Sequence, residues 1–424
     1  MKRLAPLWIG FVLVHVFVAS IGWVMPSIPM GDTVYVYEPW ARAALSGGPI
    51  VGITETWVYP QLALVPILIA QGISVLLHPL IPGTWEVGSA SYVVAWSVLV
   101  TALDALGFAA LLGGRRARRS AARRRAAWFW LAALLLLGPI AMFRIDAITV
   151  PIAVAGGVWL LSRPAVAAAL LTAGAWIKIW PGALFLAAVA LLRGRIRMIA
   201  AAAGVTVVVI GTLVLLGGSA HLFGFLTEMS GRGLQIEAVG ATPFLWGALI
   251  GSAKIAYSTE ILTFQIKGAG VDAVSAVLTP LMVLAVLAVA ALAVWRLRRG
   301  ASARRLLPPT ALALIALLIA CNKVGSPQFQ VWLFAPIILW WLFDRRTAAI
   351  PAALVLIDCA LTQVIYPLTY DALLAAQAFP IVILSIRNAL LVVICVVAVR
   401  ALLRVPATSL PVPLAAAGRT AARG

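Results

Sequence analysis

Long apolar runs recur along the whole 424-residue chain and alternate with short polar or basic segments. A run of about 18 or more apolar residues is long enough to cross a bilayer as a helix. The pattern predicts about twelve such helices, at 6–25, 88–112, 127–142, 145–162, 165–178, 180–192, 198–217, 273–295, 306–321, 329–343, 347–366 and 379–403. We therefore expect an all-α, polytopic integral membrane protein with one transmembrane domain over residues 1–404. The Pro- and Ala-rich segment 405–424 is expected to be a disordered cytoplasmic tail.

Two parts of the pattern are irregular. The runs 165–178 and 180–192 are short and predict a pair of half-length helices that meet at Lys178-Ile179-Trp180-Pro181, where proline fits the start of a helix. The apolar run Tyr59–Leu77 is interrupted by two prolines and a glycine. A span at this point would also place the largest basic loop on the side opposite to the other basic loops. We expect it to be a juxtamembrane element in the first outer loop.

Composition supports a membrane protein and suggests its orientation. The chain is 63% hydrophobic and only 11% charged, which leaves no room for a large soluble domain. Most of the basic residues that give the net charge of +19 fall in loops on one side, including the Arg115–Arg125 and Arg296–Arg305 runs. By the positive-inside rule this side and both termini are cytoplasmic. The basic runs lack interleaved aromatics, so we expect membrane lipids rather than nucleic acid as partners.

No spacing of metal ligands occurs in the sequence. Cys321, Cys359 and Cys395 are scattered through apolar segments, and the three histidines are equally dispersed. No carboxylate pair has Asp-x-Asp spacing. We therefore expect neither a metal nor a cofactor.

Several polar residues interrupt the apolar pattern or lie directly beside it, where charge is costly and marks candidate sites. They are Asp32, Arg144, Asp146, Lys178, Arg232, Glu237, Lys323 and Gln328. In the predicted topology all of them lie at the outer ends of spans or in the outer segments 26–87 and 218–272. This one-sided distribution predicts a single cavity that opens towards the outer leaflet.

Each of these residues also has a structural interpretation. Asp32 could be a general base or the N-cap of an amphipathic helix at Val34–Leu45. Arg144 could bind an anion while Asp146 orients it, or the two could form a local ion pair at the membrane interface.

The remaining cations have the same ambiguity. Lys178 could bind phosphate or extend towards Trp176 and Trp180. Lys323 precedes Pro327, which predicts a helix start whose free N–H groups attract anions, but it could be an ordinary loop lysine. The group formed by Arg232, Gln235 and Glu237 could be a binding loop or a plain surface loop.

Taken together, the polar segments resemble a known family over residues 20–390. The resemblance rests on Gly31-Asp32 with Tyr35, Tyr59-Pro60, Phe143-Arg144-Ile145-Asp146, Lys178-Ile179-Trp180-Pro181, Arg232-Gly233-Leu234-Gln235-Ile236-Glu237 and Lys323-Val324-Gly325-Ser326-Pro327-Gln328-Phe329. The chain is similar to glycosyltransferase family 87, the polyprenyl-phosphate-mannose-dependent mannosyltransferases of actinobacteria, within the GT-C superfamily. It departs from the family at Gln61, where a second proline is frequent, and at Ala238, where serine is frequent.

The resemblance implies a fold and a reaction. It implies juxtamembrane helices in the first outer loop, and a hexosyltransferase that moves mannose from a polyprenyl-phosphate donor to a glycolipid or lipoglycan on the outer face of the cell membrane. Asp32 would be the catalytic base, and inversion would follow from a single displacement. Donor-phosphate binding would fall to Arg144, Lys178, Arg232 and Lys323, with Asp146, Tyr35, Gln235, Glu237 and Gln328 in support.

Two other functions fit parts of the sequence. A transporter or lipid flippase would place its binding groups near the bilayer midplane, between broken helices. A related transferase could use another lipid-linked sugar, such as arabinofuranose. A cavity that holds Asp32, Lys178 and Lys323 and is closed on one side would favour the enzyme over the transporter.

Overall fold

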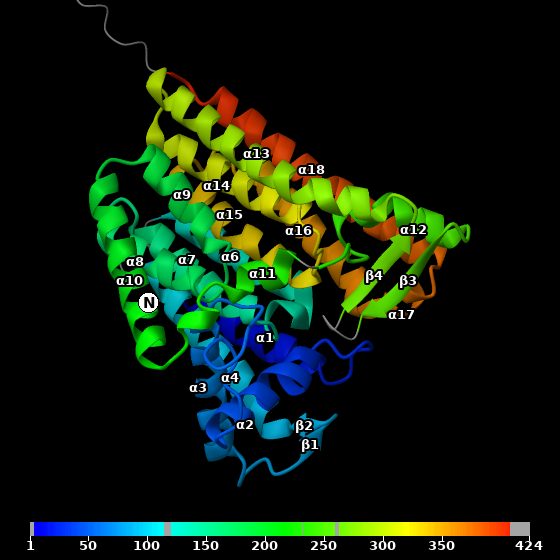
Figure 1. The fold of residues 1–424 in the computed structure, drawn as a ribbon. Coiled ribbons are helices and arrows are strands. Elements are labelled where there is room, and N and C mark those ends of the chain that lie inside the picture. The colour runs from blue at the N-terminus through cyan, green and yellow to red at the C-terminus, as the bar shows by residue number, and fades with distance from the viewer. Residues whose placement is uncertain (1–3, 114–119, 231, 259–262, 408–424) are drawn as a thin grey trace, which may run out of the picture.

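The computed structural model describes residues 4–113, 120–230, 232–258 and 263–407. The predicted tail lies almost wholly outside this range, as does the first half of the Arg115–Arg125 run. The helices in the described residues are α1 (Ala5–Ile21), α2 (Glu38–Leu45), α3 (Leu64–Leu77), α4 (Ala90–Leu112), α6 (Ala121–Leu137), α7 (Ile145–Trp159), α8 (Pro164–Ala175), α9 (Pro181–Leu191), α10 (Arg195–Leu215), α11 (Gly224–Ser230), α12 (Thr242–Leu249), α13 (Val271–Arg298), α14 (Ala303–Ala320), α15 (Phe334–Phe343), α16 (Ala349–Gln363), α17 (Tyr370–Leu374) and α18 (Ala378–Arg404) (Figure 1).

The protein is an α-helical membrane protein. Over the described residues, seven helical segments are long and apolar enough to cross a membrane: Ala90–Leu112, Ala121–Ala141, Arg195–Leu215, Val271–Arg298, Ala303–Ala320, Ala349–Leu368 and Ala378–Arg404. Each of the twelve predicted spans coincides with a helix or a helical segment, but five of them are shorter, at 10–17 residues. The junction between α8 and α9 and the separate helix α3 also agree with the sequence pattern.

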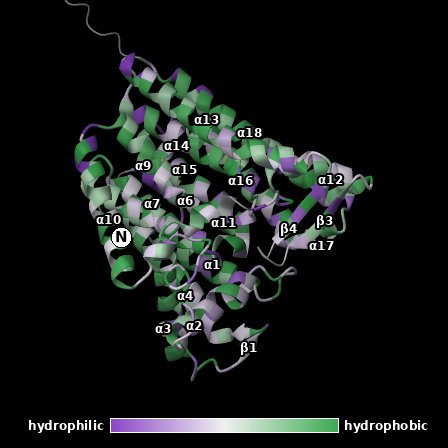
Figure 2. Ribbon diagram, viewed as in Figure 1, coloured by the Kyte–Doolittle hydropathy of each residue, from purple (hydrophilic) through white to green (hydrophobic). Residues whose placement is uncertain are grey.

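Burial divides the helices into a central group and a peripheral group. In α14, 67% of the apolar window is buried inside the protein, whereas in α10 and α13 only 17% is buried. Because apolar residues coat the outer faces of these peripheral helices (Figure 2), lipid is the solvent that suits them.

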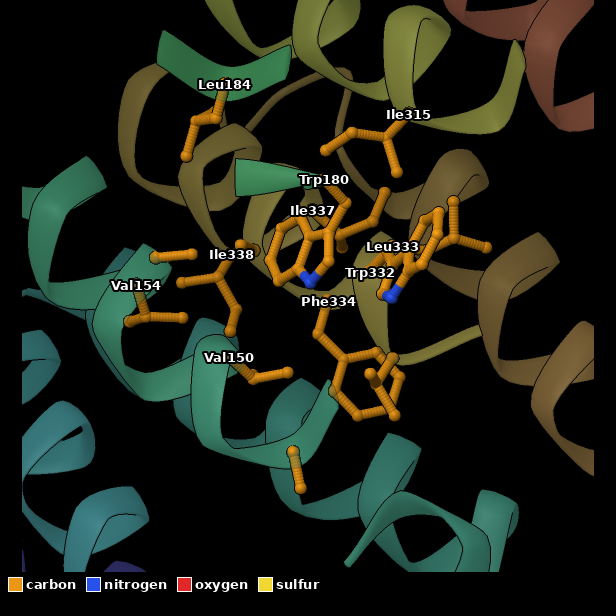
Figure 3. Packing of buried hydrophobic residues seen from close by; sticks show 14 of the residues in the cluster. Val150, Val154, Trp180, Leu184, Ile315, Trp332, Leu333, Phe334, Ile337 and Ile338 are labelled. Atoms are coloured by element: carbon orange, nitrogen blue, oxygen red, sulfur yellow. The ribbon is translucent and has the colours of Figure 1, made fainter. Parts of the chain in front are cut away.

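The centre of the core lies directly beside the candidate site. Residues of α7, α9, α14 and α15 interdigitate there around two tryptophans (Figure 3). Trp180 and Trp332 stack with ring centroids 6.3 Å apart. Their indole N–H groups donate to Thr149 (2.8 Å) and to the carboxylate of Asp146 (2.6 Å). Since a buried indole needs a hydrogen-bond acceptor, the packing of this core also fixes a charged residue.

Two short antiparallel hairpins were not predicted. Strands β1 (Thr84–Trp85) and β2 (Gly88–Ser89) pair near α2, and β3 (Ala253–Ser258) pairs with β4 (Thr263–Gly268) beside α12 (Figure 1). The β3–β4 pair joins Ile255 to Ile266 and Tyr257 to Phe264 on one face. Both strands of this pair lie within the outer segment 218–272 or at its edge, for which the apolar pattern predicted no secondary structure.

Candidate functional site

Asp32 is held by side chains from distant segments. It occupies the N-cap position of a short π-helical turn, Thr33–Tyr37, but its side chain makes no capping hydrogen bond, so capping does not account for the carboxylate. Its Oδ2 instead lies 3.2 Å from Nε of Arg144 and accepts a 3.5 Å hydrogen bond from Tyr37. The Asp32 side chain is still 31% exposed, so it remains within reach of a ligand.

Arg144 is buried and fully engaged. It precedes α7, and it donates to the carbonyl of Pro29 (2.8 Å) and to the hydroxyl of Tyr366 (3.4 Å). Burial alone lowers the pKa of Arg144, but the Asp32 carboxylate and the neighbouring tyrosine hydroxyls together outweigh this effect and raise the pKa. Arg144 therefore pairs with Asp32 and not, as the local interpretation had it, with Asp146.

Asp146 pairs with Lys178. Lys178 lies at the junction of α8 and α9, with its Nζ 3.6 Å from Oδ2 of Asp146. The same Nζ lies 4.4 Å from the ring centroid of Tyr59 and 5.6 Å from that of Phe329, a cation–π arrangement. Burial lowers the pKa of Lys178, while Asp146 opposes that shift. We call Asp32, Arg144, Asp146 and Lys178 the cavity cluster.

A cavity of about 510 Å³ adjoins this cluster. Its polar lining includes Lys178, Arg232, Lys323 and Gln328, and no aspartate or glutamate of the described residues lines it. The rest of the wall is largely apolar, with residues from α11, α13 and α14, from the segment after α14, from the junction of α8 and α9 and from the segment before α3. The cavity therefore suits a ligand that combines an anionic group with an apolar chain.

Arg232, which lines the cavity, has a hydrogen-bond donor that the described residues do not satisfy. Its buried Nε has no hydrogen-bond partner within the described part of the chain. Burial lowers the pKa of its guanidinium, against the smaller opposing effects of Tyr59 and Glu228. An unpaired buried donor is costly, and an anion in the cavity would satisfy it.

Asp32 and Arg144 do not line the cavity, but Tyr59 connects the two regions. Tyr59 lines the cavity beneath Lys178. Burial raises the pKa of Tyr59, and the carboxylates of Asp32 and Asp146 raise it further. Asp146 lies 3.6 Å from Lys178, which also lines the cavity.

The polar loop predicted around Arg232, Gln235 and Glu237 packs against the segment after α14 and supports the cavity wall. The backbone N–H of Gln235 donates to the carbonyl of Lys323 (2.9 Å), and the Gln235 side chain accepts from the N–H of Gly325 (2.9 Å). A Cβ on Gly325 would lie 2.1 Å from the backbone nitrogen of Ala238, so this approach requires glycine. Two segments about 90 residues apart thus fix Arg232 and Lys323 on one cavity.

Two predicted supporting residues lie apart from the cavity. Glu237 is buried and forms a 3.4 Å ion pair with Arg387 of α18. The side chain of Gln330 lies between Arg387 and Asp358 of α16. Its amide oxygen accepts from Arg387, and its amide nitrogen donates to the Asp358 carboxylate. We call Glu237, Asp358 and Arg387 the closed cluster. Tyr35 is exposed, and its hydroxyl donates to Glu86.

No protein-family model and no curated protein matches the sequence. The functional assignment thus depends on the residues themselves. Within the described ranges, no group of three or more His, Cys, Asp or Glu side chains could hold a metal ion. What the arrangement offers is a partly exposed carboxylate beside a cationic, amphiphilic cavity. It can accept a proton on one side and bind an anion on the other.

Sequence reasoning missed several residues of this site. Trp332 and Tyr366 hydrogen-bond charged residues, yet each lies in an apolar segment that predicted only packing. Tyr37, which donates to Asp32, lies in the predicted amphipathic helix Val34–Leu45 and was given no role in the site. Tyr59 was noted as part of a motif but given no role. A tyrosine or tryptophan within an apolar run carries a polar group that needs a partner, and this was the available signal.

Proposed function

We propose that the protein is a membrane glycosyltransferase that moves a hexose, mannose by its resemblance to family 87, from a polyprenyl-phosphate donor to a glycolipid or lipoglycan. The observation that carries this proposal is the Asp32 carboxylate beside a cavity whose charged lining is entirely cationic. A lipid phosphate presents an anion and an apolar chain together. The cationic residues of the cavity lining match the anion, and the apolar residues match the chain.

The proposed topology has about twelve spans, both termini in the cytoplasm, and α3 as a juxtamembrane helix in the first outer loop. The cavity then opens on the extracytoplasmic side. Nucleotide sugars are absent from that side, so a lipid-carried donor is the consistent choice. The short helices α8 and α9 would insert as a pair, with Lys178 at their tip.

The proposed reaction is a single displacement at the anomeric carbon. A hydroxyl oxygen of the acceptor bonds to that carbon as its bond to the phosphate oxygen breaks. Asp32 takes the proton of the hydroxyl. The leaving polyprenyl phosphate takes the bonding electrons, and Lys178, Arg232 and Lys323 stabilise its added negative charge. A β-linked donor gives an α-linked product.

The test is transfer by purified protein in lipid nanodiscs, with polyprenyl-phosphate mannose and candidate phosphoinositide glycolipids. We expect product from the wild type and a loss of at least about 10³-fold in Asp32→Asn, with donor binding retained. Asp272→Asn is the matched control, because Asp272 is an exposed carboxylate in the first turn of α13. Normal turnover by Asp32→Asn would end the proposal, and transfer of arabinofuranose alone would change the donor.

A further inference from the structure

The chain immediately before Asp32 has an unusual backbone. Ser27 and Ile28 have φ angles of 56° and 46°, so two consecutive residues other than glycine lie in the left-handed region. This conformation costs roughly 1–2 kcal/mol per residue, and a β-branched side chain such as that of isoleucine is especially unsuited to it. Such a turn persists only where its surroundings fix it.

Two side chains fix this turn. The Tyr366 hydroxyl lies 3.0 Å from the carbonyl oxygen of Ser27 and 3.3 Å from that of Ile28. Arg144 donates to the next carbonyl, that of Pro29, at 2.8 Å. Three successive carbonyls thus point at two side chains from distant parts of the sequence.

The same two side chains contact each other and the carboxylate. Arg144 Nη2 donates to the Tyr366 oxygen (3.4 Å), and Arg144 Nε lies 3.2 Å from Asp32 Oδ2. Tyr366 therefore accepts from Arg144 and donates to the turn, while Arg144 joins the turn to Asp32. Both are buried, with relative exposures of 9% and 6%, and neither lines the cavity.

We propose that Tyr366 and Arg144 are positioning residues, which hold the Ser27–Pro29 turn and so aim the Asp32 carboxylate at the acceptor hydroxyl. This inference rests on the proposed function, because it gives the base of that reaction its support. It also moves Arg144 from the group that binds the donor phosphate to the group that holds the base. Tyr366 acts only through Arg144 and the turn, so its effect falls on kcat and not on donor binding.

The experiment compares Tyr366→Phe with Tyr370→Phe in the transfer assay. Tyr370 packs against Tyr366 with ring centroids 4.9 Å apart, whereas the hydroxyl that holds the Ser27 and Ile28 carbonyls belongs to Tyr366, so Tyr370 is a control for ring packing. We expect Tyr366→Phe to lower kcat about 10-fold to 100-fold, with the donor KM within about twofold. The melting temperature should fall by only a few degrees, because one buried hydroxyl is lost. Tyr370→Phe should retain wild-type kcat.

Arg144 provides a second readout. Arg144→Met removes the contacts to Asp32 and Tyr366, so it should lower kcat while the donor KM stays within about twofold of the wild type. Arg144→Lys keeps the charge but not the forked contacts. It should therefore recover only part of the lost kcat.

A double-variant cycle decides whether Tyr366 acts through Asp32. In an Asp32→Glu background the base is already displaced, so Tyr366→Phe should cost much less than it does in the wild type. An equal cost in both backgrounds, or wild-type kcat in Tyr366→Phe, overturns the inference. The proposed function fails separately, if Asp32→Asn still turns over normally.

Discussion

The cavity cluster and the closed cluster are built from the same kinds of residue and differ in access. Each joins acids and bases from segments far apart in the sequence. In the cavity cluster the side chains of Asp32 and Lys178 are 31% and 15% exposed. In the closed cluster Glu237 and Arg387 are each 1% exposed. A charge within a membrane helix or at its end is therefore not sufficient to mark a site, because both clusters meet that criterion.

The charge balance of the two clusters separates them further. The cavity cluster pairs two acids with two bases, and the adjoining cavity adds Arg232 and Lys323, so an anion would complete it. The closed cluster has two acids and one arginine, and no ligand can reach it. A proton retained by one acid would neutralise it. The first arrangement suits ligand binding and the second suits the anchoring of α16 and α18 to the loop that carries Arg232.

Removal of the closed cluster's single cation should give the largest effect on stability. Arg387→Met leaves two buried carboxylates without their counter-ion, and we expect a loss of about 3–5 kcal/mol in unfolding free energy. The measurement is denaturant or thermal unfolding in detergent. Arg298→Met is the matched control, since Arg298 is exposed at the end of α13, and it should change stability by no more than about 0.5 kcal/mol. Equal stability of the two variants would refute the anchoring role.

The pH dependence of stability should reveal the retained proton. Burial raises the pKa of Glu237 from 4.5 to about 7, against the opposing effects of Arg387 and then Arg144. Between these pH values the unfolded chain has lost the proton and the folded chain keeps it, so stability falls as pH rises from 4.5 to about 7. Above that window the contribution is constant. At about 1.4 kcal/mol per pKa unit, the total is about 3–4 kcal/mol.

Glu237→Gln isolates this contribution, because glutamine stays neutral throughout. We expect the wild type to lose stability relative to Glu237→Gln between pH 4.5 and 8, and melting curves of both proteins at the two pH values measure it. Other titrating groups are common to both proteins. If the difference in stability between the wild type and Glu237→Gln does not change with pH, Glu237 is ionised over the whole range. The closed cluster would then retain its negative charge.

The helices were predictable because the apolar runs that specify them are local. Every predicted span overlaps a helix, the break at Lys178 separates α8 from α9, and Pro327 begins a 3₁₀ helix, Pro327–Leu333, that leads into α15. The gathering of polar residues was also predictable in part, and the contacts of Gln235 with the loop after Lys323 agree with it.

The pairing of those residues was not predictable. Arg144 and Asp146, two positions apart, take different partners, Asp32 and Lys178. Arg144 precedes α7 in an extended backbone conformation, whereas Asp146 lies in the first turn of the helix, so their side chains point to different surroundings. That choice depends on how helices far apart in sequence pack. The same holds for Glu237, which pairs with α18, and for Tyr366.

The smallest predicted effect concerns the cavity side alone. Arg232→Gln removes a cation. Within the described residues no carboxylate lies within hydrogen-bonding distance of it, so we expect the melting temperature to change little. The rate should fall about 10-fold to 100-fold, or about 1.4 to 2.7 kcal/mol of transition-state stabilisation. Arg232→Lys keeps the charge and should recover part of the rate. A stability loss as large as that of Arg387→Met, with normal transfer, would place Arg232 with the closed cluster and remove the distinction between the two regions.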